Sequence, residues 1–222
     1  MKAISVGYAM IGLGFYVVLA SFIFWLAGSR SLPFFYAVFA SQMLVSLIGS
    51  FSLSPELLNE RVKPGGKDRD PVGTPILASL WCLQLAAAAM DVGHWHIGSS
   101  VPPALQVIAV FVMTLAWFGC LWAMQANFFF SSAIRLQEDR GQQVVAAGPY
   151  AWIRHPGYAF ASLGLVSEGL ALGSWLTLLP TAFMVAYLFY RTLLEERMLH
   201  PGLEGYGDYS SKVRFKWIPG VW

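Results

Sequence analysis

The chain has 222 residues, of which 57% are hydrophobic and only 12% are charged, and its mean hydropathy is +0.58. A soluble domain carries about 25% charged residues, so this composition excludes a soluble globular protein and indicates an integral membrane protein. The formal net charge of +2 is too small to indicate nucleic-acid binding. The basic residues stand beside apolar runs, where they would face lipid headgroups.

Six segments are apolar over the length that crosses a bilayer, which requires about 20 mainly apolar residues in a helix. They are residues 4–27, 32–53, 73–92, 103–130, 157–173 and 174–194. The first is too long and too continuously apolar for a signal peptide, whose apolar core is roughly 7–15 residues. The last two meet at Gly173-Ser174, so we expect a tight helical hairpin there. The sequence therefore predicts an all-α integral membrane protein, a bundle of about six transmembrane helices.

The distribution of Lys and Arg predicts the orientation of this bundle. With six spans, thirteen of the fourteen basic residues fall on one side of the membrane, and only Arg30 falls on the other. Loops rich in Lys and Arg face the cytoplasm. We therefore expect both termini on the cytoplasmic side of a multi-pass protein.

Two loops are interpreted as ordinary connectors. Residues 54–71 mix charges of both signs with Gly and Pro, which is typical of a solvated segment. His94 and His96 could bind a metal ion, but no third ligand with a recognisable spacing lies nearby. We favour an interfacial role for them and expect no metal site. Cys82 and Cys120 fall inside apolar runs, so we expect buried free thiols.

An irregular stretch, Gly148 to Tyr158, stands at the edge of the fifth span and reads Gly-Pro-Tyr-Ala-Trp-Ile-Arg-His-Pro-Gly-Tyr. Pro149 and Pro156 lack a backbone donor and disfavour helical geometry at the residue before them. Irregular backbone at membrane depth is tolerated only where protein or a water-filled cavity covers it. This stretch is therefore the first candidate for a binding site.

Acidic residues in the last two spans add to this candidate. Glu168 would lie at membrane depth, where a carboxyl either serves function or ties helices together, and both interpretations stay open. Arg191 and Glu195 share one helix face, whereas Glu196 points about 100° away. Carboxylates at a helix C-terminus oppose the macrodipole, so a cation is expected to meet them.

Taken in order, several motifs resemble the isoprenylcysteine carboxyl methyltransferase family, whose broader group includes membrane phospholipid N-methyltransferases. They are Gly148-Pro-Tyr150, Arg154-His-Pro-x-Tyr158, Arg191-x-x-x-Glu195-Glu196, Tyr206-x-x-Tyr209 and a closing Ile-Pro. The resemblance covers roughly residues 125 to 222. It implies a methyltransferase that uses S-adenosylmethionine, with S-adenosylhomocysteine as product, in a cytosolic pocket without a Rossmann domain. It divides the chain into N-terminal transmembrane helices (residues 1–130, four spans) and a cofactor-binding catalytic region (131–222).

The resemblance also implies roles for the residues on the matching positions. The cofactor-binding residues would be Gln142, Gly148, Tyr150, Arg154, His155, Pro156, Tyr158, Glu196, Tyr206 and Tyr209. The catalytic residues would be Arg191, Glu195 and Glu196. Arg191, held by Glu195, would bind an anionic headgroup. Phe160 departs from the family pattern, which commonly has Gly there, and it could narrow the approach of a lipid tail.

The favoured function is methylation of a lipophilic acceptor, most like carboxyl methylation of an isoprenylcysteine. A phospholipid N-methyltransferase or a small-thiol S-methyltransferase stays open within this class. An NADPH-dependent 5α-reductase-like membrane reductase would need more basic groups for the cofactor phosphates, and a non-catalytic membrane scaffold does not account for the polar residues gathered in the last hundred positions. The expected partners are the lipid bilayer and a lipophilic or prenylated small-molecule or protein substrate, with no nucleic acid and no metal.

Overall fold

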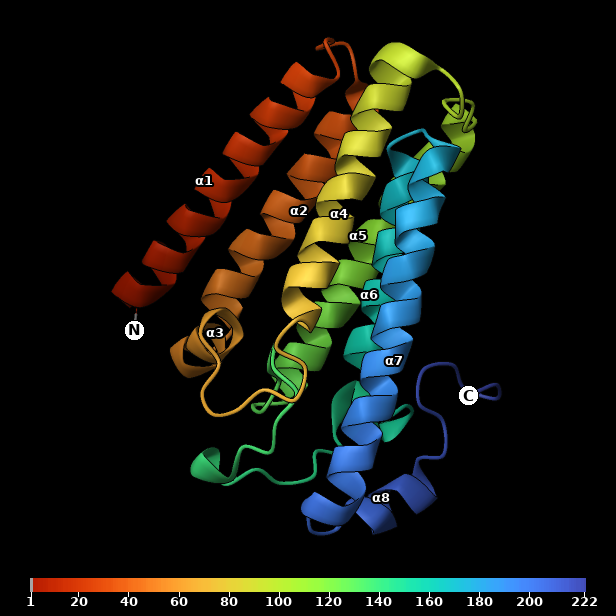
Figure 1. Cartoon of the computed structure of the whole chain (residues 1–222). Coiled ribbons are helices and arrows are strands. Elements are labelled where there is room, and N and C mark those ends of the chain that lie inside the picture. Colours follow the sequence, from red (N-terminus) through yellow and green to blue (C-terminus); the bar gives the residue numbers. More distant parts are fainter. Residues whose placement is uncertain (1) are drawn as a thin grey trace.

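The computed structural model describes residues 2–222, and it describes side chains from Ile4 onward. Within that range the chain is helical and contains no strand. The α-helices are α1 Lys2–Leu26, α2 Pro33–Ser52, α3 Pro55–Val62, α4 Gly73–Met90, α5 Pro103–Ala126, α6 Pro156–Ala171, α7 Leu178–Gly202 and α8 Tyr206–Lys212 (Figure 1). The prediction of an all-α integral membrane protein is confirmed.

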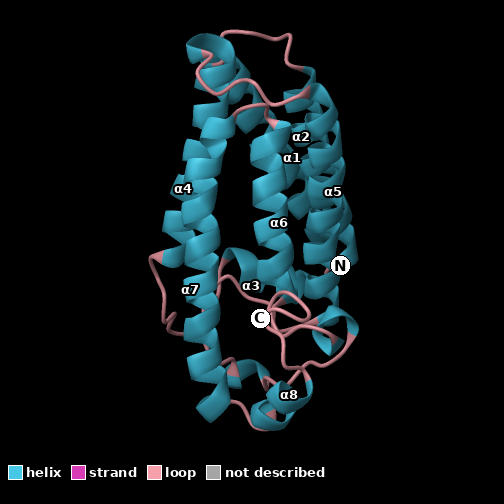
Figure 2. Cartoon of the chain, turned by 90° about the vertical axis from the view of Figure 1, so that its right-hand side faces the viewer, coloured by secondary structure: helices cyan, strands magenta, loops and turns pink. Residues whose placement is uncertain are grey.

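Five of these helices, α1, α2, α4, α5 and α7, are long and apolar enough to cross a membrane. The fifth predicted span, residues 157–173, corresponds to α6, which has only 16 residues because Pro156 begins it and the left-handed Gly173 turns the chain just after it. This helix packs between α5 and α7 and is largely buried (Figure 2). A short central helix therefore completes the bundle beside five longer ones.

The helix ends differ from the predicted ones at two places. Helix α5 ends at Ala126 and not at residue 130, because the Asn127 side chain accepts a hydrogen bond from the Phe129 N–H (2.9 Å) and turns the chain. Helix α7 continues beyond residue 194 to Gly202, well past the apolar segment. The predicted hairpin between α6 and α7 is present, and the Ser174 side chain caps its turn by accepting from the Leu176 N–H.

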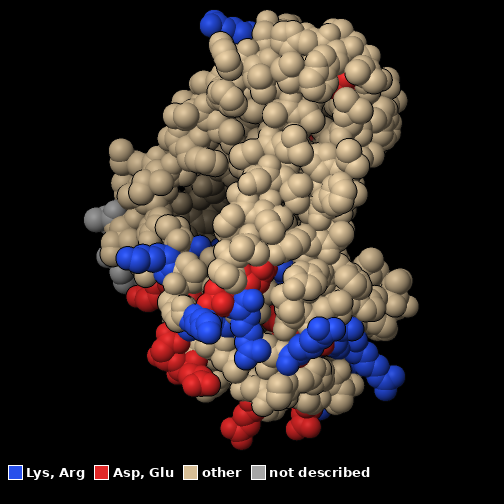
Figure 3. Space-filling model, in the orientation of Figure 1, with Lys and Arg blue, Asp and Glu red and all other residues tan. Residues whose placement is uncertain are grey.

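Charged residues gather at the lower end of the molecule, where the short helices α3 and α8 lie, whereas the upper end shows few of them (Figure 3). Both ends of the chain lie in this lower half (Figure 1). The fold thus has one strongly polar end, as the distribution of Lys and Arg predicted.

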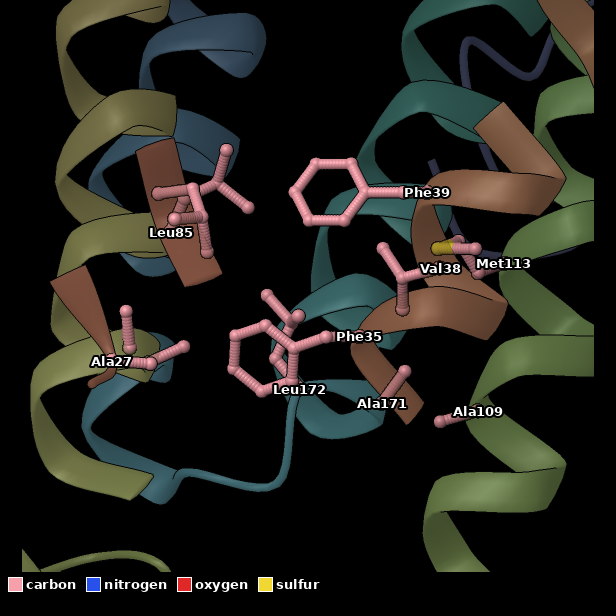
Figure 4. Packing of buried hydrophobic residues seen from close by; sticks show 12 residues of the cluster. Ala27, Phe35, Val38, Phe39, Leu85, Ala109, Met113, Ala171 and Leu172 are labelled. Carbon is pink, nitrogen blue, oxygen red and sulfur yellow. The ribbon is translucent and has the colours of Figure 1, made fainter. Parts of the chain in front are cut away.

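The closest packing lies toward the opposite end. There a cluster of buried side chains joins five helices (Figure 4). It includes the end of α1, the first half of α2, the second half of α4, the first half of α5 and the end of α6. Its labelled members are Ala27, Phe35, Val38, Phe39, Leu85, Ala109, Met113, Ala171 and Leu172. Gly93 also abuts the α1 end so closely that a Cβ atom would stand 2.1 Å from the Ala27 carbonyl oxygen. This end of the bundle is closed.

Two side chains in the spans differ from or refine the sequence interpretation. Cys82 is exposed on the outside of the bundle, so its expected burial is wrong, while Cys120 is buried. Glu168 is completely buried, and its Oε1 accepts hydrogen bonds from Gln42 Nε2 (2.8 Å) and Trp81 Nε1 (3.1 Å). These contacts tie α6 to α2 and α4, which favours the structural interpretation of this carboxyl.

Candidate functional site

A cavity of about 790 Å³ lies in the half of the bundle that carries the charged end. Ligand sites in proteins commonly measure about 300–1,000 Å³. One wall is apolar and comes from α1, α2, α4 and α5, with side chains such as Ile11, Val45 and Leu77. The other wall is polar and comes from the segment between α5 and α6, from α7 and from α8. The molecular surface is hollowed just above the charged end (Figure 3).

The irregular stretch Gly148 to Tyr158, called the central motif from here on, forms part of this polar wall. Its first part is a 3₁₀ turn, Gly148–Ala151, and the chain stays irregular until Pro156 begins α6. The N–H groups of Arg154 and His155 donate to the carbonyls of Phe215 and Lys216 (both 2.9 Å), so the C-terminal tail runs alongside the motif. The motif is therefore irregular, as predicted, and protein covers it.

The Glu196 carboxylate is buried, and three other residues predicted from the sequence meet around it. Arg154 grips it with two bonds, from Nε (2.8 Å) and from a terminal nitrogen (2.7 Å). His155 Nε2 and the Tyr206 hydroxyl each lie 2.7 Å from its Oε1. The remaining terminal nitrogen of Arg154 donates to the carbonyls of Val213 and Arg214 (2.8 Å each). Arg154 and Glu196 therefore satisfy each other; Arg154 is part of the cavity wall, and Glu196 lies behind it.

This cluster fixes the charge of His155. Burial lowers the pKa of its imidazole, but hydrogen bonds to Glu195 and Glu196 outweigh burial, so the pKa lies above its ordinary value. Burial and the bond to Glu196 together raise the pKa of the Tyr206 phenol well above its ordinary value. The two carboxylates therefore favour the imidazolium form of His155, and the Tyr206 phenol is neutral.

The positions of Glu195 and Glu196 relative to the cavity differ from the expected ones, in which Glu196 was the cofactor-binding carboxylate. Glu195 lines the cavity, its side chain is 31% exposed, and its Oε2 lies 3.6 Å from His155 Nδ1. Glu196 lies outside the cavity wall. Of this pair, Glu195 is the carboxylate that a cationic ligand can reach.

Arg191 also lines the cavity, but its expected pairing with Glu195 is wrong. Its Nε lies 3.4 Å from Asp70 Oδ2, and its terminal nitrogen donates to the Ser132 carbonyl (2.8 Å). Asp70 comes from the loop before α4 and is itself held by the Tyr187 hydroxyl (2.9 Å). Helical spacing placed Arg191 and Glu195 on one face, but a carboxylate from a distant segment meets the guanidinium instead.

Most of the predicted site residues do come together. The cavity wall includes Gln142, Tyr150, Arg154, His155, Tyr158, Arg191, Glu195, Tyr206 and Tyr209. Gly148, Pro156 and Glu196 support this wall from behind it. Phe160 does not narrow the cavity, because its ring packs against Gly119 of α5, where an added Cβ atom would stand 2.5 Å from the ring.

The segment 54–71, interpreted as a solvated connector, is instead part of the site. Glu60 is buried and pairs with Arg135 (3.1 Å), and Asp70 is buried beside Arg191. One signal in the sequence marks α3: Ser54 precedes Pro55 and Glu56, and its side chain accepts from the Leu57 N–H as an N-cap.

Comparison with known proteins identifies the central part of the chain. The model of the isoprenylcysteine carboxyl methyltransferase family matches residues 106–201, which hold most of α5, the central motif, α6 and most of α7. The match begins earlier than the resemblance read from the motifs and ends before Tyr206. No curated protein matches the chain. Residues 106–201 of this integral membrane protein are therefore similar to the isoprenylcysteine carboxyl methyltransferase family.

Proposed function

We propose that the protein is an S-adenosylmethionine-dependent methyltransferase that acts on the carboxylate of a lipophilic acceptor, most like an isoprenylcysteine. The observation that carries this proposal is the cavity itself, in which a polar wall and an apolar wall enclose one space of about 790 Å³. A methyltransferase of this kind must bring a charged nucleoside cofactor and a lipophilic acceptor together, away from water.

The polar wall suits this cofactor. Glu195 is the carboxylate that faces the cavity, so it can meet the ammonium group or a ribose hydroxyl. The rings of Tyr150, Tyr206 and Tyr209 line the same wall, and tyrosine rings can stack on a base or face a positive charge. Their hydroxyls already have partners, since Tyr209 donates to the Tyr150 carbonyl (2.8 Å) and Tyr206 to Glu196. The Arg154–Glu196 pair would shape the pocket from behind.

We extend the proposal to the division of the chain. Residues 131–222 supply the polar wall, with the helical hairpin and the C-terminal tail. The spans within residues 1–130 supply the apolar wall, which would take the hydrocarbon part of the acceptor.

The bound cofactor would supply an electrophilic methyl group, whose carbon–sulfur bond breaks as a carbon–oxygen bond to the acceptor forms, giving a thioether and a methyl ester. An ionised carboxylate brings no proton to remove, so the chain needs no general base. His155 fits this requirement, because its contacts with Glu195 and Glu196 favour the protonated imidazolium, which cannot accept a further proton. Its part would be to fix the position of Glu195.

An amine acceptor, as in a phospholipid N-methyltransferase, would require a base for the departing proton. Glu168 and His155 are the candidates for this base. Glu168 lies outside the cavity wall, with its Oε1 occupied by Gln42 and Trp81, and the two carboxylates beside His155 favour its protonated form. These placements favour the carboxylate over the amine.

Calorimetric titration of the detergent-purified protein with S-adenosylhomocysteine tests the proposal, with NADPH in a parallel titration. We expect saturable binding of the first ligand only. Glu195→Gln should weaken it at least tenfold, because a hydrogen bond to a charged group contributes about 1.5–3 kcal/mol. Glu204→Gln, at an exposed glutamate of the same end, is the matched control and should bind like the unaltered protein. Binding of NADPH alone would contradict the proposal and favour a reductase.

A further inference from the structure

Arg61 occupies an unexpected place at the cavity. It is the penultimate residue of α3, and it reaches the cavity wall next to Leu58 and Val62 of the same helix. Helix α3 lies outside the segment that matches the family, which begins at residue 106. Its arginine has therefore no role by family membership.

The backbone of Arg61 is held firmly. Its carbonyl accepts a hydrogen bond from the Ser132 hydroxyl (3.0 Å). The preceding residue, Glu60, pairs with the buried Arg135 (3.1 Å) and accepts from the Ser131 hydroxyl (2.9 Å). These bonds fasten α3 to the segment that follows α5, so the Arg61 side chain starts from a fixed point.

The guanidinium of Arg61 lies 5.1 Å from the centre of the Phe130 ring, in a cation–π contact, and lines the cavity. Burial lowers the pKa of Arg61 from its ordinary value; Cys120 and Tyr158 oppose this effect, and the positive charge of Arg191 adds to it. Arg61 thus shares the cavity with Arg191 and Tyr158.

The other cations of this region have carboxylate partners. Arg191 is paired with Asp70, Arg154 with Glu196, and Arg135 with Glu60 and Asp139, while His155 lies between Glu195 and Glu196. Among the described side chains, residues 4–222, Arg61 has no ion-pair partner and its guanidinium makes no hydrogen bond. Arg61 is half-buried, so the partial loss of solvent and the nearby guanidinium of Arg191 both disfavour its unpaired charge. A bound anion would offset both.

We propose that Arg61 holds the carboxylate of the lipophilic acceptor, with Arg191 beside it, where the polar and apolar walls meet. The inference rests on the proposed function, because it takes the cavity as the place where acceptor and cofactor meet. The planar fork of a guanidinium matches a carboxylate with two parallel hydrogen bonds. The hydrocarbon chain would extend from there along the apolar wall. Arg61 is then a residue that selects an acid over a neutral lipid.

The test compares the binding affinity of an acidic acceptor analogue with that of the corresponding neutral carboxamide. Affinities of N-acetyl-S-farnesylcysteine and of its carboxamide are measured for the unaltered protein, Arg61→Gln, Arg61→Lys and Arg197→Gln, with S-adenosylhomocysteine bound throughout. Arg197 is an exposed arginine of α7 and gives the matched control. We expect the unaltered protein and Arg197→Gln to prefer the acid about tenfold or more, as a charge-assisted hydrogen bond implies. Arg61→Gln should abolish this preference while the carboxamide binds as before, and Arg61→Lys should keep part of it.

Three results would overturn the inference. Equal weakening of acid and carboxamide in Arg61→Gln would mean that Arg61 only packs against Phe130. An unchanged preference together with lost S-adenosylhomocysteine binding would assign Arg61 to the cofactor's carboxylate. If the unaltered protein bound S-adenosylhomocysteine but neither acceptor analogue, the acceptor class would be wrong. Failure of the proposed function is recognised separately, because the unaltered protein would then bind no S-adenosylhomocysteine at all.

Discussion

Neighbouring glutamates on α7 illustrate how one helical step separates two tasks. Glu196 points to the tail and the central motif, where it accepts bonds from Arg154, His155 and Tyr206. Glu195 faces the cavity and contacts the other side of the same imidazole and the Tyr158 hydroxyl. One histidine therefore links the supporting cluster to the ligand-facing carboxylate, so a change in its charge reaches both.

The charge of His155 should make stability depend on pH. Its folded-state pKa is raised, so the stabilisation is complete below the ordinary histidine pKa of about 6.5 and is lost as the pH rises from there through the folded value. A tenfold difference in proton affinity between the folded and unfolded states corresponds to about 1.4 kcal/mol. We expect the Tm of the detergent-purified protein to fall over this range, and His155→Gln to lose that part of the decline. The groups facing the ring are Glu195, Glu196 and the stacked Tyr158.

His96→Asn is the control for this measurement, because His96 is exposed at the opposite end of the bundle. It should keep the full pH dependence. The same slope in His155→Gln as in the unaltered protein would show that His155 does not carry it.

At this scale the sequence predicted the residues that lie in motifs but not their partners. Nine of the residues predicted from the motifs line one cavity. Asp70 and Arg61 were missed, because nothing within a charged loop tells which side chain will be buried. Their roles depend on contacts with residues far along the chain: Ser132 for Arg61, and Tyr187 and Arg191 for Asp70.

Among the elements, α5 and α6 show how a short helix fits inside a bundle. Their interface pairs glycines with large rings: Gly119 with Phe160, Gly164 with Trp117, and Gly157 with Phe130. Small residues let helices approach closely in a membrane, where packing replaces the hydrophobic effect as the driving force. The unusual Phe160 is accommodated by a glycine on the facing helix, and this compensation could not be read from either position alone.

Substitution of Gly119 should test this packing. In Gly119→Ala the new methyl group would stand 2.5 Å from the Phe160 ring, so the ring or the helix must shift. We expect a loss of about 1–3 kcal/mol, as for overpacked cores, seen as a lower Tm in detergent. Adding Phe160→Ala should recover part of this loss, because it removes the clashing ring.

Gly14→Ala on α1 is the matched control, since an added Cβ atom there has nothing within 4 Å. It should leave Tm unchanged or slightly raise it, because alanine favours the helix. A Gly119→Ala variant as stable as this control would show that α5 and α6 are not tightly packed at this point.

Helices were predicted from apolar length, which is why the long ones were found and α3 was not. Eight residues of mixed polarity cannot span a bilayer, so α3 was left within a loop. Its helical start depends on the Ser54 cap, and its burial depends on the Glu60–Arg135 pair. The ends of α5 and α7 were displaced for a similar reason, because caps and turns and not hydropathy decide where a helix stops.

The whole molecule is polarised along its length, with charge at one end and apolar packing at the other. We expect the charged end to lie in the cytoplasm, with both termini and the cavity mouth. In a variant whose two cysteines are replaced by alanine, Ser211→Cys on α8 should react with a membrane-impermeant maleimide only in inside-out vesicles. Ser99→Cys, in the loop between α4 and α5, should react only in right-side-out vesicles.

Labelling of both positions from the same side would contradict the topology and would mean that one helix does not cross. The opposite pattern would keep the fold and invert the orientation. Either result is independent of the ligand experiments.

The bundle is closed by packed side chains at its upper end and encloses the cavity in its lower half. Around Ala27 and Gly93 the chain segments approach each other backbone to backbone, beside the largely apolar core at this end. In the lower half, α1, α2, α4 and α5 each contribute side chains to the apolar wall of the cavity. Under the proposed function, we expect a bulkier acceptor chain to be accommodated at the hollow end, while the closed end keeps its packing. Tolerance for chain size and a fixed site for the transferred group would then coexist in one small protein.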